Sequence, residues 1–184
     1  MTEKEKMLRQ LIYDANYDQE LIEERRRAKD LCHEYNHLKP SDEAGQHELM
    51  LRLLGRTSGD FCIIAPFWCD YGYNIEVGKN FFANHNTVIL DAAKVTFGDN
   101  VFVAPNCGFY TAGHPIDAER RNAGLEYAYP ITVYGDKIMN STGTGTYRDA
   151  NGNELVATKV ISLPGDEGYD AFGDAVPVVK MASA

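Results

Sequence analysis

The feature that most constrains this chain is a six-residue repeat of small or apolar side chains across its middle. A helix would repeat them about every 3.6 residues and a hairpin sheet about every second residue, and neither pattern continues through this region. A six-residue period is typical of a solenoid of short strands, in which each coil buries its inward side chains by stacking on the next. The repeat therefore predicts a mainly β solenoid. Its two series are Ala65, Tyr71, Val77, Ala83 and Ile89, and then Phe97, Val103 and Phe109.

Three glycines each directly follow a member of this repeat. A corner between short strands needs a residue that tolerates positive φ or a close approach of the backbone, and glycine meets both needs. We therefore expect corners of the solenoid at Gly72, Gly78 and Gly98.

The segment before the repeat carries helical patterns instead. A capping-box pattern at Thr2 begins a first helix, which should end within residues 14–18 because turn-forming side chains gather there. Asp18 can cap a second helix that Pro40 stops. A third helix then begins at Ser41 or Asp42 and ends at Gly55.

The six-residue spacing stops after Val133, and the following segment has a different pattern. Residues 144–148 and 154–161 are strand-like and are separated by an Asn-Gly pair, which predicts a β-hairpin. A last strand is predicted over residues 176–181.

Composition excludes several classes of protein. The 184 residues carry a net charge of −9 and no basic segment large enough for a nucleic-acid surface. No long apolar run spans a membrane and no signal peptide begins the chain, so we expect a cytoplasmic protein. The four cysteines lack the spacing of a zinc ribbon or redox motif, and buried free thiols are expected at Cys32, Cys62, Cys69 and Cys107.

Short segments within the repeat make a specific resemblance visible. They are Tyr71-Gly72-Tyr73-Asn74-Ile75, Asn80-Phe81-Phe82-Ala83-Asn84, Gly98-Asp99-Asn100-Val101, Ala104-Pro105-Asn106 and Thr111-Ala112-Gly113-His114-Pro115. The sequence up to about Val133 resembles the maltose and galactoside O-acetyltransferases, which are hexapeptide-repeat acyltransferases. The resemblance implies a left-handed parallel β-helix, a homotrimer with active sites between subunits, acetyl-CoA as co-substrate, a sugar acceptor and no metal.

The resemblance also implies how the chain is divided. Residues 1–55 would form a helical cap and residues 56–133 the β-helix, with an active-site loop at 112–130. Residues 134–184 would form an atypical C-terminal segment.

Two residues carry the chemistry that the resemblance implies. His114 matches the catalytic histidine of the family, and imidazole is a natural general base near neutral pH. Asn84 matches the asparagine that contacts the reacting hydroxyl, and its amide can also donate to a developing oxyanion. From the sequence alone, a surface histidine and a turn-forming asparagine remain open as alternatives.

Further residues are candidates for holding the acceptor. Carboxylates and guanidinium groups bind sugar hydroxyls through paired hydrogen bonds, and aromatic rings can form the walls of a sugar site. Each of these side chains could instead be an ordinary surface charge or a core residue. The candidates are Asp14, Arg25, Asp70, Tyr71, Phe82 and Glu126, and no residue is assigned to acetyl-CoA.

Two other functions stay open. The coils that supply much of the family's acetyl-CoA site are not recognisable after Val133, so the chain could be an inactive β-helix that binds carbohydrate or only assembles. The second is a zinc peptidase, because His33, Glu34 and His37 form an HExxH pattern on a predicted helix. That motif needs a third protein ligand, and none is evident nearby.

Overall fold

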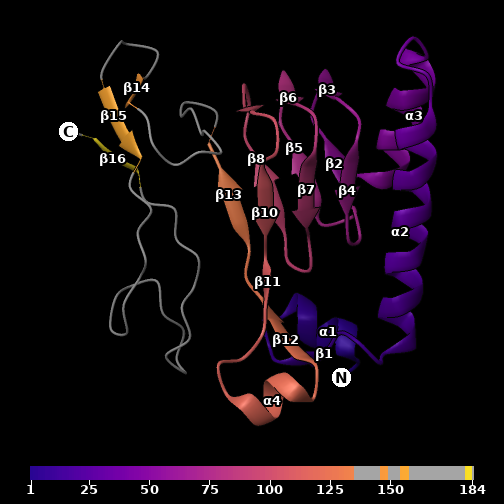
Figure 1. Ribbon diagram of the computed structural model, residues 1–184, viewed down its shortest axis with the longest axis vertical. Helices are drawn as coiled ribbons and strands as arrows, with labels where there is room; N and C mark the ends of the chain where they lie inside the picture. Colours follow the sequence, from indigo (N-terminus) through magenta and orange to yellow (C-terminus); the bar gives the residue numbers. More distant parts are fainter. Residues whose placement is uncertain (135–145, 149–153, 158–180, 184) are drawn as a thin grey trace.

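The computed structural model describes residues 1–134, 146–148, 154–157 and 181–183. Helices of the N-terminal segment lie beside a stack of short strands (Figure 1). In this view α2 and α3 run along one side of the stack, and α1 lies near one end of it. The helices are α1 (Glu3–Leu8), α2 (Gln19–His37), α3 (Glu43–Leu53) and, in a later loop, α4 (Ala118–Asn122).

The N-terminal helices begin at the caps that the sequence predicts. Thr2 and Glu5 form both hydrogen bonds of a capping box. The carboxylate of Asp18 accepts from Leu21 N at 3.0 Å, and α2 follows directly. Asp42, one of the two predicted starts, caps α3.

The first helix is shorter than predicted. It ends at Leu8, and Gln10 then adopts a φ of 60°, which interrupts the helical path. Tyr13–Asp14 form strand β1 instead, which pairs antiparallel with β12 (Leu125–Ala128). The pairing with a distant segment outweighs the local preference of residues 9–14 for helix.

The short strands form three parallel sheets, and each sheet is one face of a β-helix. Registers such as Phe61↔Phe81 and Ile75↔Val95 join residues twenty apart, so one coil takes twenty residues. The first face contains β2 (Arg56–Thr57), β5 (Ile75–Val77), β8 (Val95–Phe97) and β13 (Ile131–Val133). The second contains β3 (Phe61–Ile63), β6 (Phe81–Ala83) and β9 (Phe102–Val103), and the third β4 (Phe67–Cys69), β7 (Thr87–Leu90) and β10 (Gly108–Tyr110).

The inward positions correct the predicted register. The spacing is six from the first face to the second, six to the third, and eight back to the first. Ala65 and Tyr71 therefore lie at corners, and Ile63 and Cys69 take the inward positions of their coil. Tyr71 is still buried, but in a second cluster beneath the N-terminal segment. The inward residues are Ile63, Cys69, Val77, Ala83, Ile89, Phe97, Val103, Phe109 and Val133.

The two extra residues of each coil enlarge one corner of the β-helix. This corner follows β4 in one coil and β7 in the next. It carries Asp70 and Tyr71 in the first of these coils and Asp91 and Ala92 in the second. The broad corner is therefore the place where polar side chains can gather against the N-terminal segment.

Narrower corners are held by asparagine and glycine. Asn80, Asn86, Asn100 and Asn106 have φ between 54° and 62°, a region that asparagine tolerates better than most residues. Their side chains form ladders along the stack, with Asn80 donating to Asn100 at 2.9 Å and Asn86 to Asn106 at 3.0 Å. Gly78 is required for a different reason, because a Cβ there would lie 2.4 Å from the carbonyl carbon of Gly98.

A long loop interrupts the coils after β10. It contains β11 (Ala112–Gly113), α4 and β12, and the chain returns to the β-helix at β13. Val133 pairs with Phe97, so this coil is longer than the others by the length of the loop. Strands β11 and β12 pair with each other, and β12 also pairs with β1. The loop is therefore bound to the N-terminal segment (Figure 1).

The predicted C-terminal hairpin is present where the structure describes it. β14 (Thr146–Arg148) pairs antiparallel with β15 (Glu154–Ala157), and β16 (Met181–Ser183) pairs with β15. The Asn-Gly turn and residues 176–180 of the predicted last strand lie outside the described residues.

All four cysteines are free thiols, as predicted. Cys32 and Cys69 are buried, with their sulfur atoms 3.7 Å apart between α2 and β4. Cys62 is exposed, contrary to the prediction, because it occupies the outward position of β3. Cys107 is half-buried.

Candidate active site

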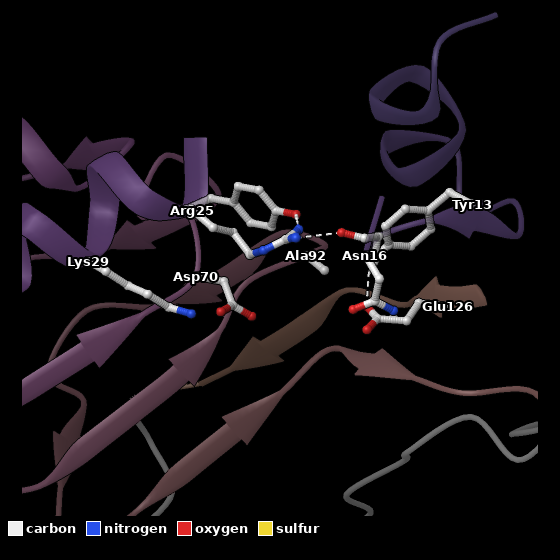
Figure 2. A pocket seen from close by; sticks show the side chains of 9 residues that line it. Tyr13, Asn16, Arg25, Lys29, Asp70, Ala92 and Glu126 are labelled. Atoms are coloured by element: carbon white, nitrogen blue, oxygen red, sulfur yellow. Dashed lines mark hydrogen bonds between the residues drawn. The ribbon is translucent and has the colours of Figure 1, made fainter. Parts of the chain in front are cut away.

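A pocket of about 140 Å³ lies where the N-terminal segment, the broad corner of the β-helix and the long loop meet. The side chains that line it come from these three segments, which are far apart in the sequence (Figure 2). They are Tyr13, Ala15, Asn16, Arg25, Lys29, Asp70, Tyr71, Ala92 and Glu126.

Helix α2 supplies the cationic wall of the pocket. Arg25 donates from Nη1 to the Tyr71 hydroxyl at 2.7 Å and from Nη2 to the carbonyl oxygen of Ala15, and its guanidinium lies 5.7 Å from the centre of the Tyr71 ring. The helix is held against β4 by Asn36, whose amide donates to Phe67 O at 2.9 Å and accepts from Phe67 N at 2.8 Å. These contacts fix the direction in which Arg25 enters the pocket.

A buried carboxylate holds the opposite wall. Asp91 Oδ1 accepts from the backbone nitrogens of Asp70 and Tyr71, at 3.0 and 2.8 Å. The Asp91 side chain is fully buried, Oδ2 has no hydrogen-bond partner among the described residues, and burial raises its pKa to about 6. Burial also raises the pKa of Asp70, against the lowering effect of Lys29 and Arg25. Asp91 thus fixes the backbone conformation at Asp70 and Tyr71, and this conformation directs the Asp70 side chain into the pocket.

The third wall comes from the loop. Glu126 lies opposite Tyr13 in the β1–β12 pairing, and the buried Tyr13 hydroxyl donates to Glu126 Oε2 at 2.9 Å. The other carboxylate oxygen of Glu126 is 3.8 Å from His114 Nε2. The N-terminal strand therefore fixes the carboxylate that connects the pocket with His114.

His114 is oriented so that one ring nitrogen is free to accept a proton. Nδ1 lies 3.0 Å from the carbonyl oxygen of Leu125, which can only accept, so Nδ1 carries the proton in the neutral ring. Nε2 then has its lone pair directed toward the side of Glu126. The side chain is 49% exposed, so an incoming hydroxyl can reach it. An exposed imidazole with this tautomer can accept a proton at Nε2 beside the polar pocket.

The structure brings together some of the predicted site residues and not others. Arg25, Asp70, Tyr71 and Glu126 line one pocket, and His114 adjoins it. Asp14 does not line it, because its carboxylate accepts from the backbone nitrogens of Asn16 and Tyr17 at 3.1 and 2.9 Å. Asn84 and Phe82 also lie outside the lining, on the second face of the β-helix.

Asn84 and Phe82 make contacts of their own at the second face of the β-helix. Asn84 Oδ1 accepts from His85 N at 2.8 Å, while its Nδ2 has no hydrogen-bond partner among the described residues. Phe82 points outward from β6 and lies beside Phe102, with ring centres 6.5 Å apart.

The comparisons with known proteins point to one family. A family model described as the maltose acetyltransferase hexapeptide capping motif matches residues 6–59. A candidate acetyltransferase of Saccharomyces cerevisiae is 47% identical over 172 residues, which cover 92% of this chain and 87% of the yeast protein. This chain belongs to the maltose and galactoside O-acetyltransferase family of hexapeptide-repeat acyltransferases.

Solved acetyltransferases share the fold. A maltose O-acetyltransferase from Clostridium difficile 630 matches with a TM-score of 0.68 and 45% identity, over 71% of this chain and 69% of that one. A galactoside acetyltransferase in complex with coenzyme A matches with a TM-score of 0.67 and 34% identity, over 71% and 64%. The predicted left-handed parallel β-helix with an N-terminal helical segment is confirmed by these acetyltransferases.

Five pocket residues of this acetyltransferase family member were not among the sequence candidates. Lys29 follows Arg25 by four residues on α2, so the same helix face carries both, and this spacing could have identified it. The other four gave no comparable signal, because they reach the pocket only through pairing of distant segments. They are Tyr13, Ala15, Asn16 and Ala92.

The HExxH pattern has a local structural role in the acetyltransferase fold. His33 and His37 lie side by side near the end of α2, with ring centres 4.1 Å apart, and His37 Nδ1 contacts His33 O at 2.8 Å. Across residues 1–134 and the three short C-terminal strands, no group of three or more His, Cys, Asp or Glu side chains is arranged to hold a metal ion. The described helices also include none that is long and apolar enough to cross a membrane.

Proposed function

We propose that this protein is a sugar O-acetyltransferase that moves the acetyl group of acetyl-CoA to a hydroxyl of maltose, glucose or a galactoside. The observation that carries the proposal is the orientation of His114 beside the pocket. Its Nδ1 is committed to the Leu125 carbonyl oxygen, and its free Nε2 faces Glu126. Family membership supplies the reaction type, and a galactoside acetyltransferase with coenzyme A is among the matching structures.

Because Nδ1 already carries a proton, Nε2 is the ring nitrogen that can act as the base. Nε2 takes the proton from the acceptor hydroxyl as its oxygen attacks the thioester carbonyl. The tetrahedral intermediate then collapses, the carbon–sulfur bond breaks, and the imidazolium returns the proton to the leaving thiolate. The Leu125 carbonyl stabilises the positive ring through the Nδ1–H hydrogen bond, and Glu126 adds a negative charge at 3.8 Å.

Asn84 would enter the reaction from an adjacent copy of the chain. It lies outside the pocket of its own chain, and its Nδ2 has no hydrogen-bond partner among the described residues. A homotrimer with active sites between subunits would bring this amide to the developing oxyanion, where such a donor lowers the barrier. We therefore assign His114 and Asn84 to one site built by two subunits.

The first experiment measures thiol release from acetyl-CoA with maltose, glucose and a galactoside as acceptors. His114→Ala should lose at least about a hundredfold in kcat, as expected when a general base is removed. His33→Ala is the matched control, since this exposed histidine lies on α2 and should leave turnover unchanged. Equal rates for the wild type and His114→Ala would contradict the assignment of the base.

A mixing experiment tests the shared site. Co-expressed His114→Ala and Asn84→Ala subunits would form mixed trimers, and about a quarter of their sites would combine one intact His114 with one intact Asn84. Each variant alone should be inactive, and the mixture should recover activity in that proportion. No recovery from correctly mixed trimers would place both residues in the same subunit's site.

An inactive carbohydrate-binding β-helix is the alternative. It is favoured by the match to the galactoside acetyltransferase structure, which covers only 64% of that chain. In that case the protein would bind sugar but not acetyl-CoA. Sugar binding without any thiol release would support this alternative over the enzyme.

A further inference from the structure

Some polar side chains of the pocket already have hydrogen-bond partners within the chain, and others do not. Arg25 is bound to Tyr71 and to the Ala15 carbonyl oxygen. Glu126 accepts from Tyr13, and the amide of Asn16 donates to the Gly124 carbonyl oxygen at 2.6 Å. These groups shape the pocket, but their strongest interactions are already made within the chain.

Lys29 and Asp70 are the exception. Among the described residues, the Lys29 ammonium has neither a hydrogen-bond partner nor an ion pair within 4.0 Å, and the Asp70 carboxylate has no hydrogen-bond donor. The two side chains point toward the same space in Figure 2. They are close enough for the charge of Lys29 to lower the pKa of Asp70, but they do not form a salt bridge.

The space between an ammonium and a carboxylate suits a hydroxyl group. A hydroxyl donates one hydrogen bond and accepts others, so it can donate to Asp70 and accept from Lys29 at once. Both bonds involve a charged partner, which makes them stronger than bonds between neutral groups. Neither a purely anionic nor a purely cationic substituent would satisfy both residues.

We propose that Lys29 and Asp70 together bind a non-reacting hydroxyl of the acceptor sugar, and that Lys29 is a specificity-determining residue. This inference rests on the proposed function. It adds a mechanism by which the pocket recognises an uncharged sugar. Lys29 enters the pocket from α2, four residues after Arg25, and Asp70 enters from the corner that Asp91 holds. The pair lies away from the Glu126 end of the pocket, where His114 acts.

The test compares Lys29→Met and Lys29→Arg with the wild type, using maltose at saturating acetyl-CoA. Lys29→Met keeps the aliphatic stem and removes the charge, so KM for maltose should rise about tenfold or more while kcat changes less than about twofold. Lys29→Arg should recover part of the affinity. Lys39→Met is the matched control, because this exposed lysine lies just beyond α2 and outside the pocket.

Asp70→Asn and the double variant show whether the two residues act on one group. If they share a hydroxyl, the double variant should lose less than the product of the two single losses. If the loss of acceptor affinity in the double variant equals the product of the two single losses, the residues act separately and the shared contact is overturned. A wild-type preference for a uronic acid over the neutral sugar would also overturn it, since Lys29 would then bind an anion.

The wild type separates failure of this inference from failure of the proposed function. If it acetylates maltose, glucose or a galactoside and Lys29→Met has an unchanged KM, only the role of Lys29 is wrong. If it neither acetylates these sugars nor binds them in a direct NMR titration, the proposed function fails and this inference fails with it.

Discussion

The hydroxyl of Tyr13 donates a hydrogen bond of 2.9 Å to the carboxylate of Glu126, across 113 residues of sequence. The two residues also face each other in the β1–β12 pairing, so backbone and side chain act together. This contact binds the N-terminal segment to the loop that carries His114. It makes the helical segment part of the candidate site as well as a cover for the β-helix.

Tyr13→Phe should therefore weaken both stability and acceptor binding. The ring is 1% exposed and phenylalanine fills the same space, so the change removes mainly one hydrogen bond to a charged group, worth about 1.5–3 kcal/mol. Urea unfolding should show this loss, and KM for the acceptor should rise. Tyr17→Phe, at a ring that is 71% exposed, is the control and should change neither quantity. Equal behaviour of the two variants would mean that the Glu126 contact contributes nothing.

The buried carboxylate of Asp91 should make the stability of the protein depend on pH. Burial raises its pKa to about 6 in the folded protein, from about 3.9 in an unfolded chain. The folded state therefore binds the proton more tightly, and the resulting stabilisation is present below about pH 4 and lost as the pH rises through about 6. A shift of this size corresponds to about 3 kcal/mol at most.

Asp91→Asn removes this dependence while keeping an oxygen for the Asp70 and Tyr71 nitrogens. Relative to the wild type, the variant should gain stability between about pH 4 and pH 7, as measured by urea unfolding at several pH values. Asp99→Asn is the control, because Asp99 also accepts a backbone N–H, from Lys79 at 2.7 Å, but is exposed. Parallel pH profiles for Asp91→Asn and the wild type would contradict the burial of a charged carboxylate at this corner.

Gly78→Ala tests the stacking of the coils. A Cβ at this position would lie 2.4 Å from the carbonyl carbon and 2.5 Å from the carbonyl oxygen of Gly98, so two coils must separate to admit it. We expect a loss of several kcal/mol or failure to fold, as for other overpacked interiors. At Gly59 the nearest atom is the flexible Lys79 Cγ at 3.1 Å, so Gly59→Ala should be mild. Similar melting temperatures for both variants would contradict the coil register.

The sequence was informative where a local pattern determines the structure. The six-residue repeat predicted stacked short strands because every coil must bury its inward side chains on the next. It misplaced Ala65 and Tyr71 because apolar residues also fill the corner, where Tyr71 belongs to the second core cluster. The eight-residue step of each coil has no local marker, since Tyr71, Asp91 and Ala92 at the broad corner are buried like the inward residues.

The pocket was only partly predictable for a related reason. Arg25, Asp70, Tyr71 and Glu126 were candidates through the family resemblance, and the fold brings them to one place. Lys29 could have been found from its spacing, since it follows Arg25 by one helical turn, whereas Tyr13 and Asn16 reach the pocket only through the pairing of β1 with β12. Asp14 was also a candidate, but its carboxylate closes a local turn and does not face the pocket.

Transfer of an acetyl group to a sugar is tested by detecting the acetylated product itself. Purified protein, acetyl-CoA and maltose would be incubated together, and the sugar fraction analysed by mass spectrometry with thiol release followed in the same sample. We expect maltose carrying one added acetyl group, formed at the rate of thiol release and absent with His114→Ala. Folded wild-type protein that acetylates neither maltose nor, in parallel incubations, glucose or a galactoside would contradict sugar acetylation.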